Sequence, residues 1–214
     1  QARASLAELA LAQADPGKAA RWLDDDPASH EGSPQARAAL VTAQGRLAAL
    51  RGDVESAQNA YSTALALRQD AGLPDWARMS ALDIAELSAR RGEHAQAEQT
   101  TRQLRRDMLE ANDARLLLLA VLAHQGETAP AQGLLDALET ELATHPDAML
   151  SLRLDLLRAV LREGHRTELA SQVAASARAI GYELLALRAD LIAGGQAGQR
   201  GKAALDRQGI RTEG

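Results

Sequence analysis

The sequence contains no cysteine and no phenylalanine, and aromatic residues make up only 2% of its 214 positions. The absence of cysteine excludes disulfide bonds, thiolate zinc sites and a cysteine nucleophile. Hydrophobic residues still reach 46%, so the core must be built from alanine and leucine, which are strong helix formers. A β-sheet protein would need the β-branched and aromatic residues that are scarce here. We therefore expect an all-α protein.

Long apolar runs and an excess of basic charge are also missing. The longest apolar run, Leu116 to Ala123, is far shorter than the roughly 20 residues that span a bilayer. The net charge is −5 and the pI about 5.6, whereas nucleic-acid-binding domains usually carry a basic stripe. We expect neither membrane insertion nor nucleic-acid binding.

The start of the chain and its choice of basic residues suggest where it comes from. The first residue is Gln1 rather than methionine, and the segment that follows is typical of an amphipathic helix rather than a signal sequence. We expect a piece of a longer protein, in the cytoplasm rather than the periplasm, although the lack of cysteine does not distinguish these compartments. The lysines are Lys18 and Lys202 against many arginines, a bias that suits a GC-rich bacterial genome.

A repeating pattern is set by four glycines, Gly52, Gly92, Gly126 and Gly164, which are spaced by 34 to 40 residues. The first three open similar phrases, with Gly-Asp-Val-Glu-Ser-Ala at Gly52, Gly-Glu-His-Ala-Gln-Ala at Gly92 and Gly-Glu-Thr-Ala-Pro-Ala at Gly126. This interval is typical of helix-pair repeats, which stack into solenoids.

Glycine, proline and aspartate clusters between apolar segments predict where the helices end. Ser33 and Thr128 are candidate N-caps, each followed by a proline that the first helical turn tolerates. The pairs are 2–14 with 16–24, 34–50 with 53–70, 74–91 with 93–110, 113–125 with 128–144, and 147–163 with 167–180. A last helix over 182–193 precedes a glycine-rich hinge at 194–201 and a short amphipathic segment at 202–208.

The helix expected at 147–163 is apolar over too wide an arc for a single buried stripe. It must therefore be covered on more than one side, as happens when a helix lies between its own partner and the next repeat.

The second pair resembles a tetratricopeptide repeat. Gly45, Ala57, Tyr61 and Ala64 stand at that family's small and aromatic positions relative to Gly52. The other pairs keep part of the pattern through Ala20 in pair one, Ala85 and Ala97 in pair three, Ala131 in pair four and Ala170 in pair five. They depart from it at Thr101, which stands where an aromatic is usual, and at Leu119 and Leu135, which replace the small and aromatic residues. The resemblance covers roughly residues 35–180 and implies a right-handed α-solenoid of about five helix pairs plus a C-terminal helix. Because each repeat packs mainly on its neighbours, we expect a single domain over 1–214.

Residues 177–189 look like the C-terminal repeats of large bacterial signalling proteins, such as kinases or transcriptional activators with a helical-repeat sensor. This implies a regulatory segment of a longer protein.

In the tetratricopeptide register, the first helix of each pair lines a concave groove. The groove residues this implies are Thr42, Arg46, Glu86, Arg90, His124, Arg158 and Arg162. Arginine at four of them would suit an acidic peptide, because guanidinium groups form bidentate pairs with carboxylates. The alternative is that these arginines only cover apolar surface. The lysine and asparagine clamp of chaperone-binding members is missing, which disfavours chaperone tails.

Other motifs carry less chemistry. The Asp24–Asp26 run lacks the ligand spacing of an EF-hand and is better explained as a solvated acidic loop. The histidines lack the spacing of a helical zinc site, and the segment from Gly194 to Lys202 departs from a phosphate-binding loop. Trp22 and Trp76 could anchor a partner, but we expect them to fill gaps between helices.

No catalytic residues, metal site or cofactor site emerge from the sequence. We expect a non-enzymatic protein-interaction module or scaffold that binds a protein or peptide, with an acidic peptide as one possibility. The alternative is an effector-sensing domain that controls an attached kinase or DNA-binding domain, for which the hinge at 194–201 would be suited. The oligomeric state, the ligand and the parent protein stay open.

Overall fold

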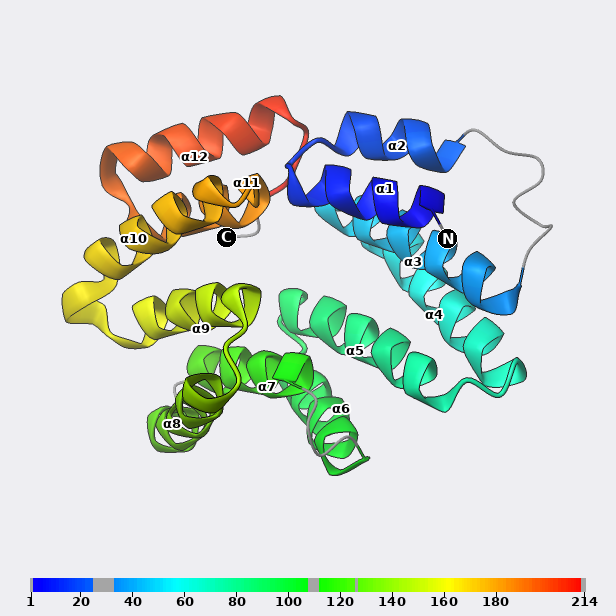
Figure 1. Ribbon diagram of the computed structural model, residues 1–214, viewed down its shortest axis with the longest axis horizontal. Coiled ribbons are helices and arrows are strands. Elements are labelled where there is room, and N and C mark those ends of the chain that lie inside the picture. The colour runs from blue at the N-terminus through cyan, green and yellow to red at the C-terminus, as the bar shows by residue number, and fades with distance from the viewer. Residues whose placement is uncertain (1, 25–32, 108–111, 126, 213–214) are drawn as a thin grey trace. The chain divides into compact units, whose positions relative to one another are not determined.

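The computed structural model describes residues 2–24, 33–107, 112–125 and 127–212, and these residues form helices and no strand (Figure 1). The all-α prediction is confirmed, and the predicted helices are present with ends shifted by a few residues. The helices are α1 (Ala2–Ala12), α2 (Pro16–Asp24), α3 (Pro34–Arg51), α4 (Val54–Asp70), α5 (Pro74–Arg90), α6 (His94–Asp107), α7 (Asn112–His124), α8 (Thr128–Thr144), α9 (Ala148–Leu161), α10 (Arg166–Ala179), α11 (Glu183–Ala193) and α12 (Gly195–Arg207). The acidic run beyond Asp24 and the repeat glycine Gly126 lie outside the described residues.

Local signals place several helix ends. Ser33 caps α3 as predicted, since its hydroxyl accepts a hydrogen bond from the Ala36 N–H at 3.2 Å. Gly52 ends α3 in the left-handed conformation, with φ at 74°. The prediction for Thr128 is wrong: it is the first residue of α8, the cap position belongs to Glu127, and no side chain bonds there.

The chain forms two compact units. The first contains residues 1–90 and 204–214, and the second contains residues 91–203. The boundary falls between α5 and α6, which the sequence assigns to one helix pair, and the single-domain interpretation stays a prediction.

In the first unit, helices adjacent in sequence pack as neighbours, and α1 also packs on α3. Gly45 of α3 lies very close to Tyr61 of α4: a Cβ atom on Gly45 would lie 2.6 Å from Tyr61 Cε1. Tyr61 is buried at 5% exposure, between Ala57 and Ala64, which are fully buried. The small and aromatic positions of the second pair therefore interlock as the sequence predicts.

In the second unit, α9 is buried on two sides, as its apolar sequence requires. Leu150 and Leu154 join a leucine cluster with α7 and α8. Leu152 instead packs with Val173 and Ala174 of α10 and with α11. One helix thus joins two clusters of the core.

The alanines that follow each repeat glycine occupy equivalent buried positions. Ala57, Ala97, Ala131 and Ala170 are all at 0% exposure. Thr101 stands in the third pair where the second pair has an aromatic, and it is also fully buried. Its hydroxyl is satisfied there, since it donates to the Ala97 carbonyl at 2.6 Å. The burial pattern recurs at the repeat interval even where the residue type changes.

The predicted hinge at 194–201 is wrong, because α12 runs through it. Gly198 and Gly201 lie against α11, where a Cβ on Gly201 would be 3.0 Å from Asp190 Cβ and 3.1 Å from the Leu187 carbonyl oxygen. These glycines therefore serve close packing of two helices.

The C-terminal residues complete the first unit in a way that a simple stack of repeats does not predict. Leu205 and Ile210 are buried at 2% and 3% exposure. The Arg211 N–H donates to the Leu50 carbonyl oxygen at 2.9 Å, at the end of α3. None of the described helices is long and apolar enough to span a membrane.

Candidate functional site

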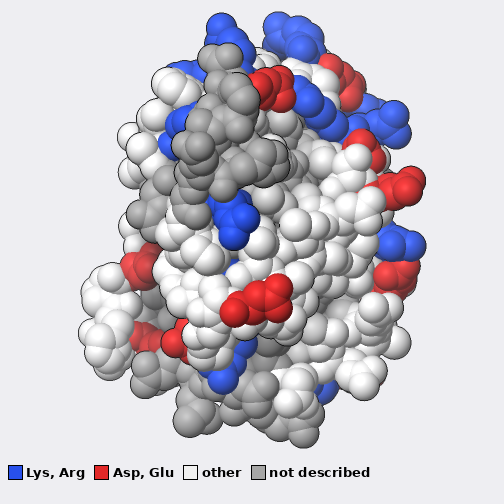
Figure 2. All heavy atoms as spheres, turned by 90° about the vertical axis from the view of Figure 1, so that its right-hand side faces the viewer, with Lys and Arg blue, Asp and Glu red and all other residues white. Residues whose placement is uncertain are grey.

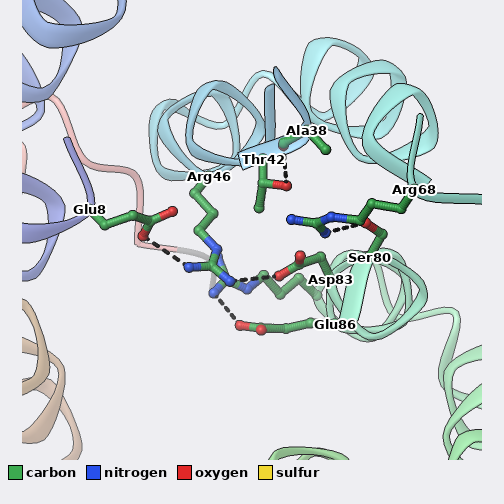
Figure 3. Close-up of polar contacts among 9 residues, drawn as sticks. Glu8, Ala38, Thr42, Arg46, Arg68, Ser80, Asp83 and Glu86 are labelled. Atoms are coloured by element: carbon green, nitrogen blue, oxygen red, sulfur yellow. Dashed lines mark hydrogen bonds and ion pairs between the residues drawn. The ribbon is translucent and has the colours of Figure 1, made fainter. Parts of the chain in front are cut away.

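The predicted groove residues of the first unit lie on α3 and α5, where they meet Glu8 of α1 (Figure 3). Arg46 of α3 lies at the centre, where its Nη1 donates to Glu8 of α1 at 2.9 Å and its Nη2 donates to Asp83 of α5 at 3.1 Å. Beside it, Arg90 pairs with Glu86 at 2.6 Å on α5. We call these five residues, Glu8, Arg46, Asp83, Glu86 and Arg90, the charged network.

The members of the charged network differ in exposure. The Asp83 side chain is 11% exposed, whereas those of Arg46, Glu8 and Glu86 are 42%, 33% and 44% exposed. Asp83 thus lies at the base of the network, and the other carboxylates lie toward solvent.

Burial and pairing act against each other on the ionisation of this network. Burial alone would lower the pKa of Arg46, but the carboxylates of Asp83 and Glu8 raise it above its ordinary value. Burial raises the pKa of Asp83, and Arg46 offsets only part of that effect. Arg46 therefore stays charged, whereas burial disfavours the charged form of Asp83.

Thr42 does not present its hydroxyl to the surface. It is buried at 6% exposure, and its Oγ1 donates to the Ala38 carbonyl at 2.8 Å. In this structure Thr42 supports the α3 helix beneath the charged network rather than lining its exposed side.

The other predicted groove residues belong to the second unit. Arg158 of α9 donates through Nε and Nη2 to Glu139 of α8, at 3.1 Å and 2.6 Å, and also pairs with Asp155. Burial raises the pKa of Asp155 despite that pairing. Arg162 is exposed and follows α9. His124 lies in α7, and its side chain falls outside the described residues.

The partners Glu8, Asp83 and Glu139 were missed from the sequence. The hydrogen bonds of Arg46 join residues 38 and 37 positions apart in the sequence, which matches the repeat interval. A search for carboxylates one repeat before and one repeat after Arg46 could therefore have found Glu8 and Asp83. For Glu139, on the helix preceding Arg158, the repeat gives no such signal.

Trp76 departs from the expectation that it fills a gap between helices, because it is 51% exposed on α5. Its ring centroid lies 5.8 Å from Cζ of Arg68, a residue of α4. Trp22 is half-buried and follows the expectation more closely.

On the face seen in Figure 2, acidic and basic side chains are interspersed among uncharged ones. Among the described residues there is no group of three or more histidine, aspartate or glutamate side chains arranged to hold a metal ion. A comparison of the chain with protein-family models, curated sequences and solved structures gave no match.

Proposed function

We propose that the chain is a non-enzymatic protein-interaction module, a right-handed solenoid of about five tetratricopeptide-like helix pairs that binds a peptide or partner domain across its first helices. The observation that carries this proposal is the joining of Glu8, Arg46 and Asp83 across α1, α3 and α5, one repeat apart in each direction.

The packing of the first helices supports the solenoid. In a stack of helix pairs, equivalent helices lie side by side and their side chains form a continuous face. In the first unit α1 packs on α3, and in the second unit α9 packs on both α7 and α11. The recurrent buried alanines add support, because equivalent residues meet equivalent surroundings in each pair.

Any partner that binds these arginines must compete with the carboxylates that already pair with them within the chain. Exposed ion pairs contribute little to stability, typically about 0–1 kcal/mol. The carboxylates of Glu8 and Glu86 are partly exposed, at 33% and 44%, so carboxylates of a partner can replace them, whereas Asp83 pairs with Arg46 at the base of the network. An acidic peptide fits this arrangement.

The test is selection from a random-sequence peptide library displayed on phage, with Arg90→Glu as the charge-reversal variant. The control is Asn59→Glu, which places the same charge on an exposed position of α4. We expect the selected peptides to bind the wild type and Asn59→Glu equally and to lose binding to Arg90→Glu, with both variants folded by circular dichroism. Failure to enrich any peptide, or equal binding to both variants, would refute the proposal.

The effector-sensing alternative was favoured by the hinge predicted at 194–201, but α12 occupies residues 195–207. No other contact among the described residues favours it, and we do not carry it further.

A further inference from the structure

Arg68 is a buried cation without a carboxylate partner in the described part of the chain. It lies in the last turn of α4 and is 4% exposed. Its Nη1 donates to the Ser80 hydroxyl at 2.5 Å, and its Nε is buried without a hydrogen-bond acceptor. Asp83 lies near enough to act on it electrostatically, but that carboxylate bonds to Arg46 (Figure 3).

An arrangement of this kind calls for an explanation. A buried charge is normally paired, and a buried donor left without an acceptor is costly. Burial lowers the pKa of Arg68, against the opposing effect of Asp83. Arg46, by comparison, is more exposed and has two carboxylates.

Trp76 lies next to this guanidinium and is itself half exposed. The indole is 51% exposed, and its ring centroid is 5.8 Å from Arg68 Cζ, a cation–π distance. Binding of a ligand at the guanidinium would require the indole, half of which faces solvent, to turn outward. An indole beside an unpaired cation offers an apolar surface and an anion site together.

We infer that Arg68 and Trp76 form a recognition site for a carboxylate of the partner peptide, with the carboxylate accepting from the Arg68 guanidinium and the adjoining apolar part of the peptide lying on the indole. This inference rests on the proposed function and names the chemistry of its partner. The carboxylate can come from an acidic side chain or from a peptide C-terminus.

The experiment uses the peptides selected from the library as probes. One arm uses amidated peptides with an internal glutamate, and the other uses peptides that carry a free C-terminus and no acidic side chain. In the arm that binds, replacing glutamate by glutamine or amidating the C-terminus should weaken binding to the wild type by about tenfold or more, since charge-assisted hydrogen bonds are the strong ones.

Arg68→Gln should cause a similar loss, and the two changes together should cost little more than either alone, as a double-mutant cycle requires for groups in contact. Arg78→Gln is the matched control on α5, where the arginine pairs with Asp75 at the surface. In the Trp22→Phe background, the fluorescence of Trp76 should change with the carboxylate peptide and not with its neutral version. The neutral substitutions in the peptide keep the test valid if Arg68→Gln does not fold.

Two results would overturn the inference. If the selected peptides lose binding to Arg90→Glu but bind Arg68→Gln as tightly as the wild type, the proposed function stands and the Arg68 site falls. If binding is indifferent to the peptide carboxylate and Trp76 fluorescence is unchanged, the site falls in the same way. Failure to enrich any peptide would refute the proposed function and this inference with it.

Discussion

A missing side chain at Gly45 sets the distance between α3 and α4. The ring of Tyr61 occupies the space that a Cβ on Gly45 would need, with Cε1 and Cδ1 at 2.6 Å and 2.7 Å from that position. Because the ring is buried at 5% exposure, it has little room to move away.

Gly45→Ala should therefore destabilise the first unit by roughly 1–3 kcal/mol, the usual cost of overpacking. Gly133→Ala is the control, because Gly133 is an exposed glycine of α8 with no atom within 4 Å of an added Cβ. That substitution should stabilise by about 0.5–1 kcal/mol through helix propensity. Urea denaturation of both variants measures the contrast, and a gain in stability for Gly45→Ala would contradict the close approach.

The carboxyl of Asp83 gives a pH dependence with a definite sign. Its pKa is raised above 3.8 chiefly by burial, so the folded state holds the proton more tightly than the unfolded state does. The stabilisation from this group is complete below pH 3.8 and is lost as the pH rises through the raised pKa. Asp83→Asn keeps an acceptor for Arg46 and removes the titration. The free energy of unfolding of the wild type relative to this variant should fall over that interval, and a constant difference would contradict the burial of Asp83.

At the scale of the element, helix ends were predictable where one residue determines the local geometry. Ser33 and Gly52 act through a single hydrogen bond or a single positive φ, and these signals are visible in the sequence. Thr128 has the same chemistry as Ser33 but lies one residue too far into α8 to cap it. Small shifts of this kind are decided by packing, which the local sequence does not specify.

The cap of α4 titrates in the opposite direction to Asp83. Hydrogen bonding with the Ser56 side chain, and then with the Ser56 N–H that donates to the Asp53 carboxylate at 3.1 Å, lowers the pKa of Asp53 below 3.8. Its stabilisation is present above that value and is lost as the pH falls through the lowered pKa. Asp53→Asn preserves an N-cap oxygen, so the wild type should lose stability relative to this variant on acidification. Thermal unfolding at a series of acidic pH values measures this, and an equal response of both proteins would argue against the cap.

The helix α12 shows where reasoning from propensity fails. Glycine costs about 1 kcal/mol relative to alanine in a helix interior, so the sequence from Gly194 to Gly201 predicts a break. Packing against α11 outweighs that cost, because glycine allows the two backbones to approach closely. Tertiary contact of this kind cannot be seen in a local sequence window.

Gly201→Ala separates the two effects. Propensity alone predicts a gain of up to about 1 kcal/mol, whereas overpacking against Asp190 and the Leu187 carbonyl predicts a loss of roughly 1–3 kcal/mol. We expect the loss. Lys202→Ala, at the exposed neighbouring position, should change stability by no more than about 0.5 kcal/mol. Chemical denaturation of the two variants decides between the effects, and a more stable Gly201→Ala protein would rule out the close contact.

At the scale of the whole molecule, the repeat interval predicted which helices would carry the candidate site but not how its charges would pair. Counting from Gly52 and Gly92 brings Arg46 and Glu86 to neighbouring first helices, and both join the charged network. Pairing depends on how far side chains reach across neighbouring helices, which the sequence does not show. Glu8 and Asp83 therefore pair with Arg46, which the sequence analysis had assigned to a bound peptide. Arg68 was missed because nothing in the sequence distinguishes a buried arginine from an exposed one.

The return of the C-terminal residues to α3 is the part of the architecture that the repeat pattern least anticipates, and it can be tested directly. Ile210 is buried at 3% exposure, and the Arg211 N–H bonds to Leu50 at 2.9 Å. Ile210→Ala should cost about 2–5 kcal/mol, the usual price of truncating a buried aliphatic side chain. Gln208→Ala, at an exposed position, serves as its control. Hydrogen exchange gives an independent measurement, because the Arg211 amide should be protected in the wild type and lose that protection in Ile210→Ala. If Arg211 exchanges freely in the wild type and Ile210→Ala is as stable as its control, the C-terminal residues do not pack on α3, and the first unit ends at α5.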